Sequence, residues 1–162
     1  MPYSPTHLDN LSNDVVARIA RWFKKAKPEP TPVDFNTQLG VHFEEIGEML
    51  ENLRANDLIT YNILVRTHIV VTQLAQHLKE HPDPVYIETE DRSDFLDSIC
   101  DQIVTAVGVG VFAYMDVTGG LSEVSDSNDS KFDPATGLPI LNEHGKIMKG
   151  PAYRKADLAP FI

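Results

Sequence analysis

The chain has 162 residues, 42% of them apolar and 23% charged, which is the size and composition of one soluble domain with a modest core. Its formal net charge of −10 argues against binding to nucleic-acid backbones or anionic membranes, because both require clustered lysine and arginine. The single cysteine, Cys100, excludes an internal disulfide and a cysteine-based zinc site. No run approaches the roughly 18–20 apolar residues of a membrane span, and the first residues do not resemble a signal peptide, so we expect a cytoplasmic protein.

The first third of the chain predicts two helices joined by a linker. Residues 12–26, capped by Ser12 or Asn13, place apolar side chains at helical spacing. Residues 27–34 hold three prolines, which favour a linker. A second helix is expected over about 34–53, because its apolar residues recur at alternating spacings of four and three. They form one predicted seam: Leu39, Phe43, Ile46, Leu50 and Leu53.

The middle of the chain predicts two longer helices. Residues 57–81 form the third helix, which the prolines of HPDP at 81–84 end. Residues 92–117 form the fourth. Its apolar side comprises Phe95, Leu96, Ile99, Ile103, Val107 and Val111.

The character of the sequence changes after TGG at 118–120. Turn-forming residues become frequent, and NEHG is expected to turn a short hairpin between Ile140 and Ile147. The predicted fold class is therefore all-α, with a four-helix-bundle-like core at about 12–118 and an irregular C-terminal arm at about 119–162. The whole chain is expected to form one domain.

Acidic residues gather on the second helix. Glu44, Glu45 and Glu48 fall on the side away from the predicted apolar seam, and the next basic residue in the sequence is Arg54. Like charges at i,i+3 and i,i+4 destabilise a helix by a few tenths of a kcal/mol per pair. Because no Lys or Arg lies at i±4 of these residues, we interpret the carboxylates as unpaired rather than as an ordinary solvated helix face.

The fourth helix repeats this pattern. Asp94, Asp97 and Asp101 lie within about 60° of one another on a helical wheel, and no Lys, Arg or His occurs from Ser93 to Ser130. If the two acidic helices pack face to face, their carboxylates converge, and only divalent cations or protons make that arrangement stable. Because all the ligands are oxygens, Mg²⁺ or Mn²⁺ is expected.

Basic residues cluster late in the chain. A metal site followed by a cationic arm suits a polyphosphate, because metals bridge phosphate oxygens while lysines neutralise the remaining charge. The arm holds Lys131, Lys146, Lys149, Arg154 and Lys155.

These segments resemble a known family. EEIGE at 44–48 matches the EExxE signature of the all-α nucleoside triphosphate pyrophosphohydrolases, the MazG-like superfamily, and LDSICDQIVTAVGVG resembles the family's second acidic helix with its ExxD motif. SNDSK and GKIMKG resemble a bacteriophage-type branch, and the resemblance covers about residues 12–160. It implies hydrolysis of a nucleoside triphosphate to the monophosphate and pyrophosphate, with roughly two or three Mg²⁺ or Mn²⁺ ions per site. It also implies a homodimer or homotetramer, in the host cytoplasm for a bacteriophage protein.

The resemblance also implies roles for individual residues. Glu45 and Glu48 become metal ligands, and Glu44 becomes a ligand or the base that orients the attacking water. Asp101 matches the aspartate of ExxD and completes the catalytic set.

One position departs from the family pattern. The family's glutamate is Ser98 here, so Asp97 is the candidate substitute ligand and Asp94 a weaker one. Substrate contacts are implied for residues of the arm, namely Asn128, Lys131, Lys146, Lys149 and Tyr153.

Other classes of function remain open. A non-enzymatic helical interaction or regulatory protein with solvated acidic faces would not be stabilised by Mg²⁺ or Mn²⁺. A carboxylate-bridged di-iron bundle requires Glu-x-x-His on its core helices, and neither His68 nor His77 has a glutamate three residues before it. Generic polar groups such as Asn36, Gln38 and Asn62 do not reveal the base, whereas analogy with bacteriophage relatives favours a purine, dGTP or GTP.

Overall fold

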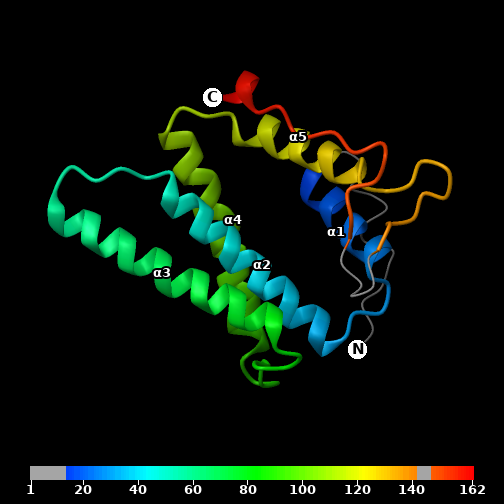
Figure 1. Ribbon diagram of the computed structural model, residues 1–162, viewed down its shortest axis with the longest axis horizontal. Coiled ribbons are helices and arrows are strands. Elements are labelled where there is room, and N and C mark those ends of the chain that lie inside the picture. Colours follow the sequence, from blue (N-terminus) through cyan, green and yellow to red (C-terminus); the bar gives the residue numbers. More distant parts are fainter. Residues whose placement is uncertain (1–13, 142–146) are drawn as a thin grey trace. The chain divides into compact units, whose positions relative to one another are not determined.

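The computed structural model describes residues 14–141 and 147–162 (Figure 1). Within these residues the chain forms five α-helices and one short 3-10 helix: α1 (Val15–Ala26), α2 (Pro32–Glu51), α3 (Leu58–Glu80), α4 (Arg92–Phe112), α5 (Val117–Asp129) and η2 (Ala159–Phe161). The same residues form no strand beyond the isolated bridges Phe132–Pro139 and Leu141–Ile147. The all-α prediction is thus confirmed for the described chain. The second bridge flanks the predicted hairpin turn, which lies outside the described residues.

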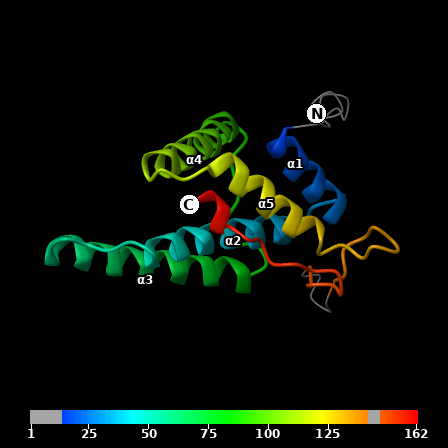
Figure 2. The ribbon, with the colours of Figure 1, turned by 90° about the horizontal axis from the view of Figure 1, so that it is seen from above.

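The described chain divides into two compact parts. One, residues 30–93, is the hairpin of α2 and α3, which run side by side in both views (Figures 1 and 2). The other holds residues 14–29 and the described residues from 94 onward, with α1, α5, η2 and nearly all of α4. The predicted single domain, four-helix bundle and oligomer remain predictions.

α2 begins within the predicted linker. The Asp34 amide donates to Thr31 Oγ1 (3.2 Å) and the Thr31 amide donates to Asp34 Oδ2 (3.0 Å), so the two residues cap the helix reciprocally. Pro32 takes the first helical position, where its missing N–H forfeits no hydrogen bond. The linker is therefore shorter than the predicted 27–34.

Two glycines of α2 allow the backbones of α2 and α3 to approach closely. Gly40 and Gly47 are buried, and a Cβ on Gly40 would lie 2.8 Å from the Ala75 carbonyl oxygen of α3. A Cβ on Gly47 would lie 3.3 Å from Thr72 Oγ1. The fully buried face of α2 is consequently a glycine seam rather than the predicted apolar one, whose members are only half-buried or, at Leu53, exposed.

Asn36 ties the end of the hairpin together. Its side chain is fully buried, and its Nδ2 donates to the carbonyls of Pro32 (3.0 Å) and Val85 (3.0 Å). Its Oδ1 accepts from the Val85 amide (3.2 Å). The hydrogen-bonding groups of the Asn36 amide are thus used within the fold.

α4 ends earlier than predicted. It stops at Phe112 rather than near residue 117, because Tyr114 adopts a positive φ of 61°. The Met115 amide turns back and donates to the Gly110 carbonyl (3.0 Å), which satisfies one of the open carbonyls at the helix end. This turn makes room for a further helix.

α5 replaces the first part of the predicted irregular arm. Asp116 caps it by accepting from the Gly119 amide (2.9 Å). Gly119 is needed here, since a Cβ at this position would lie 2.6 Å from ring carbons of Phe161 in η2. The glycines that favour a break in the sequence therefore serve as a packing surface for the C-terminus.

α4 carries apolar side chains around most of its circumference. None of its residues is buried, and Leu96 and Val104 are 62% and 67% exposed. By length and composition α4 could cross a membrane, contrary to the expectation that no such run exists, although one such helix is weak evidence of a span. Asp101 weighs against a span, because an aspartate near a helix centre costs about 2.5–3.5 kcal/mol in a bilayer.

Candidate metal and substrate site

The three predicted ligands on α2 are all exposed, and Glu44 has a cationic partner. Lys79 Nζ of α3 lies 2.7 Å from Glu44 Oε1. The interpretation of this cluster as unpaired is therefore wrong for Glu44, whose charge is offset by a residue 35 positions away in the sequence. An ion pair this exposed contributes about 0.2–1 kcal/mol to stability, so it moderates the repulsion without holding the carboxylate rigidly.

The other glutamates of residues 44–51 differ in the contacts that their carboxylates make. Glu51 pairs with His68 of α3, with 3.0 Å between His68 Nε2 and Glu51 Oε1. Glu45 and Glu48 are exposed, and among the described residues no hydrogen bond or ion pair reaches the Glu48 carboxylate. Glu48 is thus the member of the cluster whose oxygens are most available to a cation.

The predicted ligands on α4 lie in the other compact part of the chain. Asp97 and Asp101 are exposed and belong to one helix, with Asp94 in its first turn. The convergence of these aspartates with the α2 glutamates stays a prediction. Within the described residues, no three His, Cys, Asp or Glu side chains form a group that could hold a metal ion. The donor set itself, carboxylate oxygens alone, fits Mg²⁺ or Mn²⁺.

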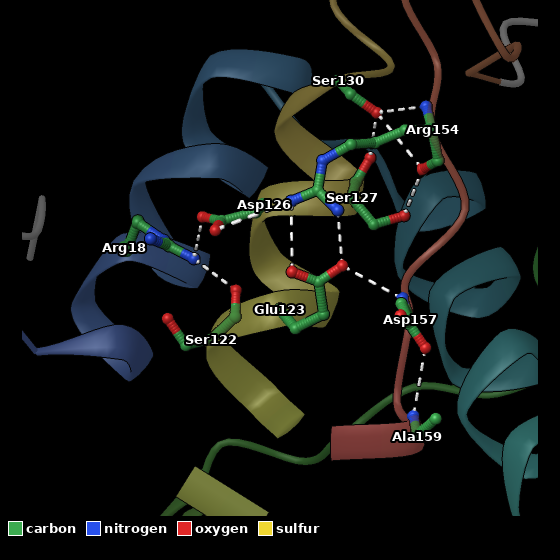
Figure 3. Close-up of polar contacts among 9 residues, drawn as sticks. All are labelled: Arg18, Ser122, Glu123, Asp126, Ser127, Ser130, Arg154, Asp157 and Ala159. Carbon is green, nitrogen blue, oxygen red and sulfur yellow. Dashed lines mark hydrogen bonds and ion pairs between the residues drawn. The ribbon is translucent and has the colours of Figure 1, made fainter. Parts of the chain in front are cut away.

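Around the predicted substrate residue Asn128, the serines of SNDSK hold the C-terminal arm (Figure 3). Ser127 Oγ donates to the Arg154 carbonyl (2.8 Å), and the Arg154 amide donates to Ser130 Oγ (2.9 Å). The Asn128 carbonyl accepts from Trp22 Nε1 (3.0 Å), while its side chain is half-buried. Lys131, also half-buried, follows directly after α5.

Arg154 belongs to a second set of contacts that the sequence did not predict. Its guanidinium forks onto both oxygens of Glu123, and the Asp157 amide donates to Glu123 Oε1 (3.0 Å), as Figure 3 shows. The hydrogen bond from Arg154, followed by that from Asp157, lowers the pKa of Glu123 below its usual range. The same bond raises the pKa of Arg154. Arg154 therefore fastens the arm, whereas the sequence placed it among the phosphate-binding cations.

Arg18 connects α1 to α5, as Arg154 connects the arm to α5. Its Nε donates to Ser125 Oγ (2.7 Å), and its Nη2 donates to the Ser122 carbonyl (2.8 Å) and to Asp126 Oδ1 (2.8 Å). Ser125 is buried, and the hydrogen bond from Arg18 satisfies its hydroxyl group.

The last predicted substrate residues lie further along the arm. Lys149 Nζ sits 4.8 Å from the ring centroid of Tyr153, a cation–π contact that keeps the two side chains together. Lys146 lies outside the described residues.

Comparison of the chain with protein-family models, with curated proteins and with solved structures gives no match.

Proposed function

We propose that the chain is a metal-dependent pyrophosphohydrolase that converts a nucleoside or deoxynucleoside triphosphate into the monophosphate and pyrophosphate. The observation that carries the proposal is the exposed carboxylate cluster of α2, in which Glu44, Glu45 and Glu48 lie within little more than one helical turn. Asp97 and Asp101 of α4 are the proposed further ligands. This donor set is suited to hard cations and to little else.

Each residue has a role in this proposal. Glu45, Glu48 and Asp101 hold the ions, with Asp97 in place of the carboxylate missing at Ser98. Bound Mg²⁺ or Mn²⁺ would polarise the α-phosphate and lower the pKa of water. Glu44 accepts a hydrogen bond from the attacking water and takes its proton.

The arm is proposed to bind the substrate. Lys131, Lys146 and Lys149 neutralise the triphosphate, and Asn128 and Tyr153 contact the rest of the nucleotide. A purine triphosphate, dGTP or GTP, is the proposed substrate, and a homodimer or homotetramer is the proposed assembly. The apolar side chains exposed along α4 support association of this kind.

The proposal is tested with a panel of ribonucleoside and deoxynucleoside triphosphates in Mg²⁺ or Mn²⁺, scored for monophosphate and pyrophosphate. We expect Glu48→Gln to reduce turnover at least a hundredfold with its helix content unchanged. Glu29→Gln, an exposed substitution outside the cluster, is the matched control and should keep full activity. Full activity of Glu48→Gln would refute the assignment, and release of a nucleoside diphosphate would identify cleavage of the terminal bond instead.

A helical interaction protein is the second candidate. The pairing of Glu44 with Lys79 and of Glu51 with His68 favours it, because partnered carboxylates need no metal. It predicts an unchanged melting temperature in Mn²⁺, whereas the pyrophosphohydrolase proposal predicts a rise of several degrees.

A further inference from the structure

Two histidines lie one turn apart at the end of α3. His77 belongs to the last turn of the helix, and His81 is the residue at which the helix ends. Both residues are exposed, and their rings stack with centroids 4.0 Å apart and an interplanar angle of 28°. Residues four apart lie on one face of a helix, and a pair of histidines at this spacing is a way in which helices hold Zn²⁺.

The His81 ring is fixed in one tautomer. Its Nδ1 lies 2.8 Å from the carbonyl oxygen of His77. Because a carbonyl oxygen only accepts, Nδ1 carries the proton and donates it, which leaves the lone pair of the neutral ring on Nε2. Histidines that bind metals almost always donate their second ring nitrogen to a carbonyl or carboxylate oxygen in this way. The hydrogen bond therefore orients His81 as a ligand through Nε2.

The ring nitrogens that a metal ion would need are not used by other side chains. In the described part of the chain, no hydrogen bond or ion pair reaches the ring nitrogens of His77 or the Nε2 of His81. Glu80, the residue before His81, accepts a hydrogen bond from Gln76 and not from either histidine. The two imidazoles are thus available together on one exposed helix end.

The backbone below the pair is held by the α2–α3 hairpin. Ala75 and Leu78 are buried, with 2% and 1% of their surface exposed. A Cβ on Gly40 of α2 would lie 2.8 Å from the Ala75 carbonyl oxygen and 3.2 Å from the Leu78 Cβ, so the two helices are in close contact here. Side chains on a fixed backbone lose less freedom when they bind, and the pair is in this respect pre-organised.

The separation of the rings suits one shared ion. Zn–N bonds are about 2.0–2.1 Å long, so two nitrogens on the same ion are at most about 4.2 Å apart. Rings with centroids 4.0 Å apart reach such a geometry by rotation of two exposed side chains. Imidazole suits Zn²⁺, Ni²⁺ and Cu²⁺, whereas Mg²⁺ and Mn²⁺ prefer oxygen ligands. The histidine pair therefore differs in metal preference from the glutamates of α2.

We propose that His77 and His81 together bind one divalent transition-metal ion, Zn²⁺, Ni²⁺ or Cu²⁺, with water in the remaining coordination positions. The described residues supply no third His, Cys, Asp or Glu to the pair, so the ion keeps open positions for a further ligand. Cu²⁺ should bind most tightly, because nitrogen ligands favour it over Ni²⁺ and Zn²⁺. The site requires neither Mg²⁺ nor a nucleotide, and the inference is independent of the proposed pyrophosphohydrolase activity.

The test titrates the untagged full chain with Zn²⁺ by calorimetry and follows the histidine ring signals by NMR. We expect saturable binding, a joint shift of the His77 and His81 ring signals, no competition by excess Mg²⁺, and displacement of Zn²⁺ by Cu²⁺. His77→Gln and His81→Gln should each weaken binding at least tenfold, since the loss of even an outer partner of a ligand typically costs about 10–100-fold. Both residues are exposed, so the helix content of the variants should be unchanged.

His68→Gln is the matched control, because it removes a histidine of the same helix that pairs with Glu51 instead. It should keep the affinity of the wild type, as should Glu48→Gln, which separates this site from the acidic cluster. Wild-type affinity for Zn²⁺ in His77→Gln or His81→Gln overturns the proposal. An equal loss in His68→Gln or Glu48→Gln, or equal shifts of all histidine signals, overturns it as well, because the ion would then bind elsewhere or without selectivity.

Discussion

The two compact parts of the chain differ in the contacts that stabilise each of them internally. In the α2–α3 hairpin, glycines bring the helices so close that an added methyl group at Gly40 would meet a backbone oxygen. In the part built from α1, α5 and the arm, Arg18 and Arg154 fasten the helices through serines and carboxylates. At these positions the hairpin requires a close approach of the two backbones, whereas in the other part arginine side chains connect the segments.

The largest expected effect is on the hairpin. Gly40→Ala places its Cβ 2.8 Å from the Ala75 carbonyl oxygen, which belongs to a helix backbone and cannot yield cheaply. We expect the free energy of unfolding to fall by about 1–3 kcal/mol, measured by denaturant unfolding. Gly108→Ala is the matched control, since nothing lies within 4 Å of the added Cβ, and it should stabilise by about 0.5–1 kcal/mol through helix propensity. Similar losses in both variants would contradict the glycine seam.

A second substitution weakens the contact between the C-terminal arm and α5. Arg154→Ala removes the guanidinium fork on Glu123, so the arm should detach from α5 more often. Limited proteolysis should cleave the last residues of the chain several-fold faster than in the wild type, while α2 and α3 keep their resistance. Lys155→Ala, which removes a neighbouring exposed charge, should behave as the wild type. An unchanged rate in Arg154→Ala would show that the fork does not retain the arm.

The hydrogen bonds from Arg154 to Glu123 predict that the stability of the protein depends on pH. The pKa of Glu123 is lowered in the folded protein, so its contribution to stability is present above the unfolded pKa and is lost as the pH falls through the folded value. The stability difference between wild type and Glu123→Gln should therefore be full at neutral pH and should shrink below about pH 4. Unfolding curves at several pH values measure it, and a difference that grows on acidification would have the wrong sign.

The smallest expected effect on stability concerns an ion pair of the α2–α3 hairpin. Lys79→Met removes the cationic partner of Glu44, and because the pair is exposed the loss should be about 0.2–1 kcal/mol. If the glutamate cluster binds a divalent ion, the same variant should bind Mn²⁺ more tightly, since a competing cation is gone. Weaker Mn²⁺ binding in the variant would argue that Lys79 supports the site instead.

The local sequence pattern predicted the positions of the helices well and the contacts between them poorly. Apolar spacing and prolines located α1 to α4 to within a few residues, except at the end of α4. α5 was missed because Gly119 and Gly120 read as a break in the sequence. Their packing against Phe161, 42 positions away from Gly119, could not be read from local pattern. Nothing local to Glu44 or Glu123 indicated Lys79 or Arg154, because these partners depend on how helices pair.

We propose that the acidic clusters of α2 and α4 bind the same divalent ions. Paramagnetic broadening of backbone amide NMR signals by substoichiometric Mn²⁺ tests it most directly. We expect signals around Glu44–Glu48 and around Asp97–Asp101 to broaden together, and Glu48→Gln to suppress both effects. Broadening of one helix alone, or of neither, would contradict it.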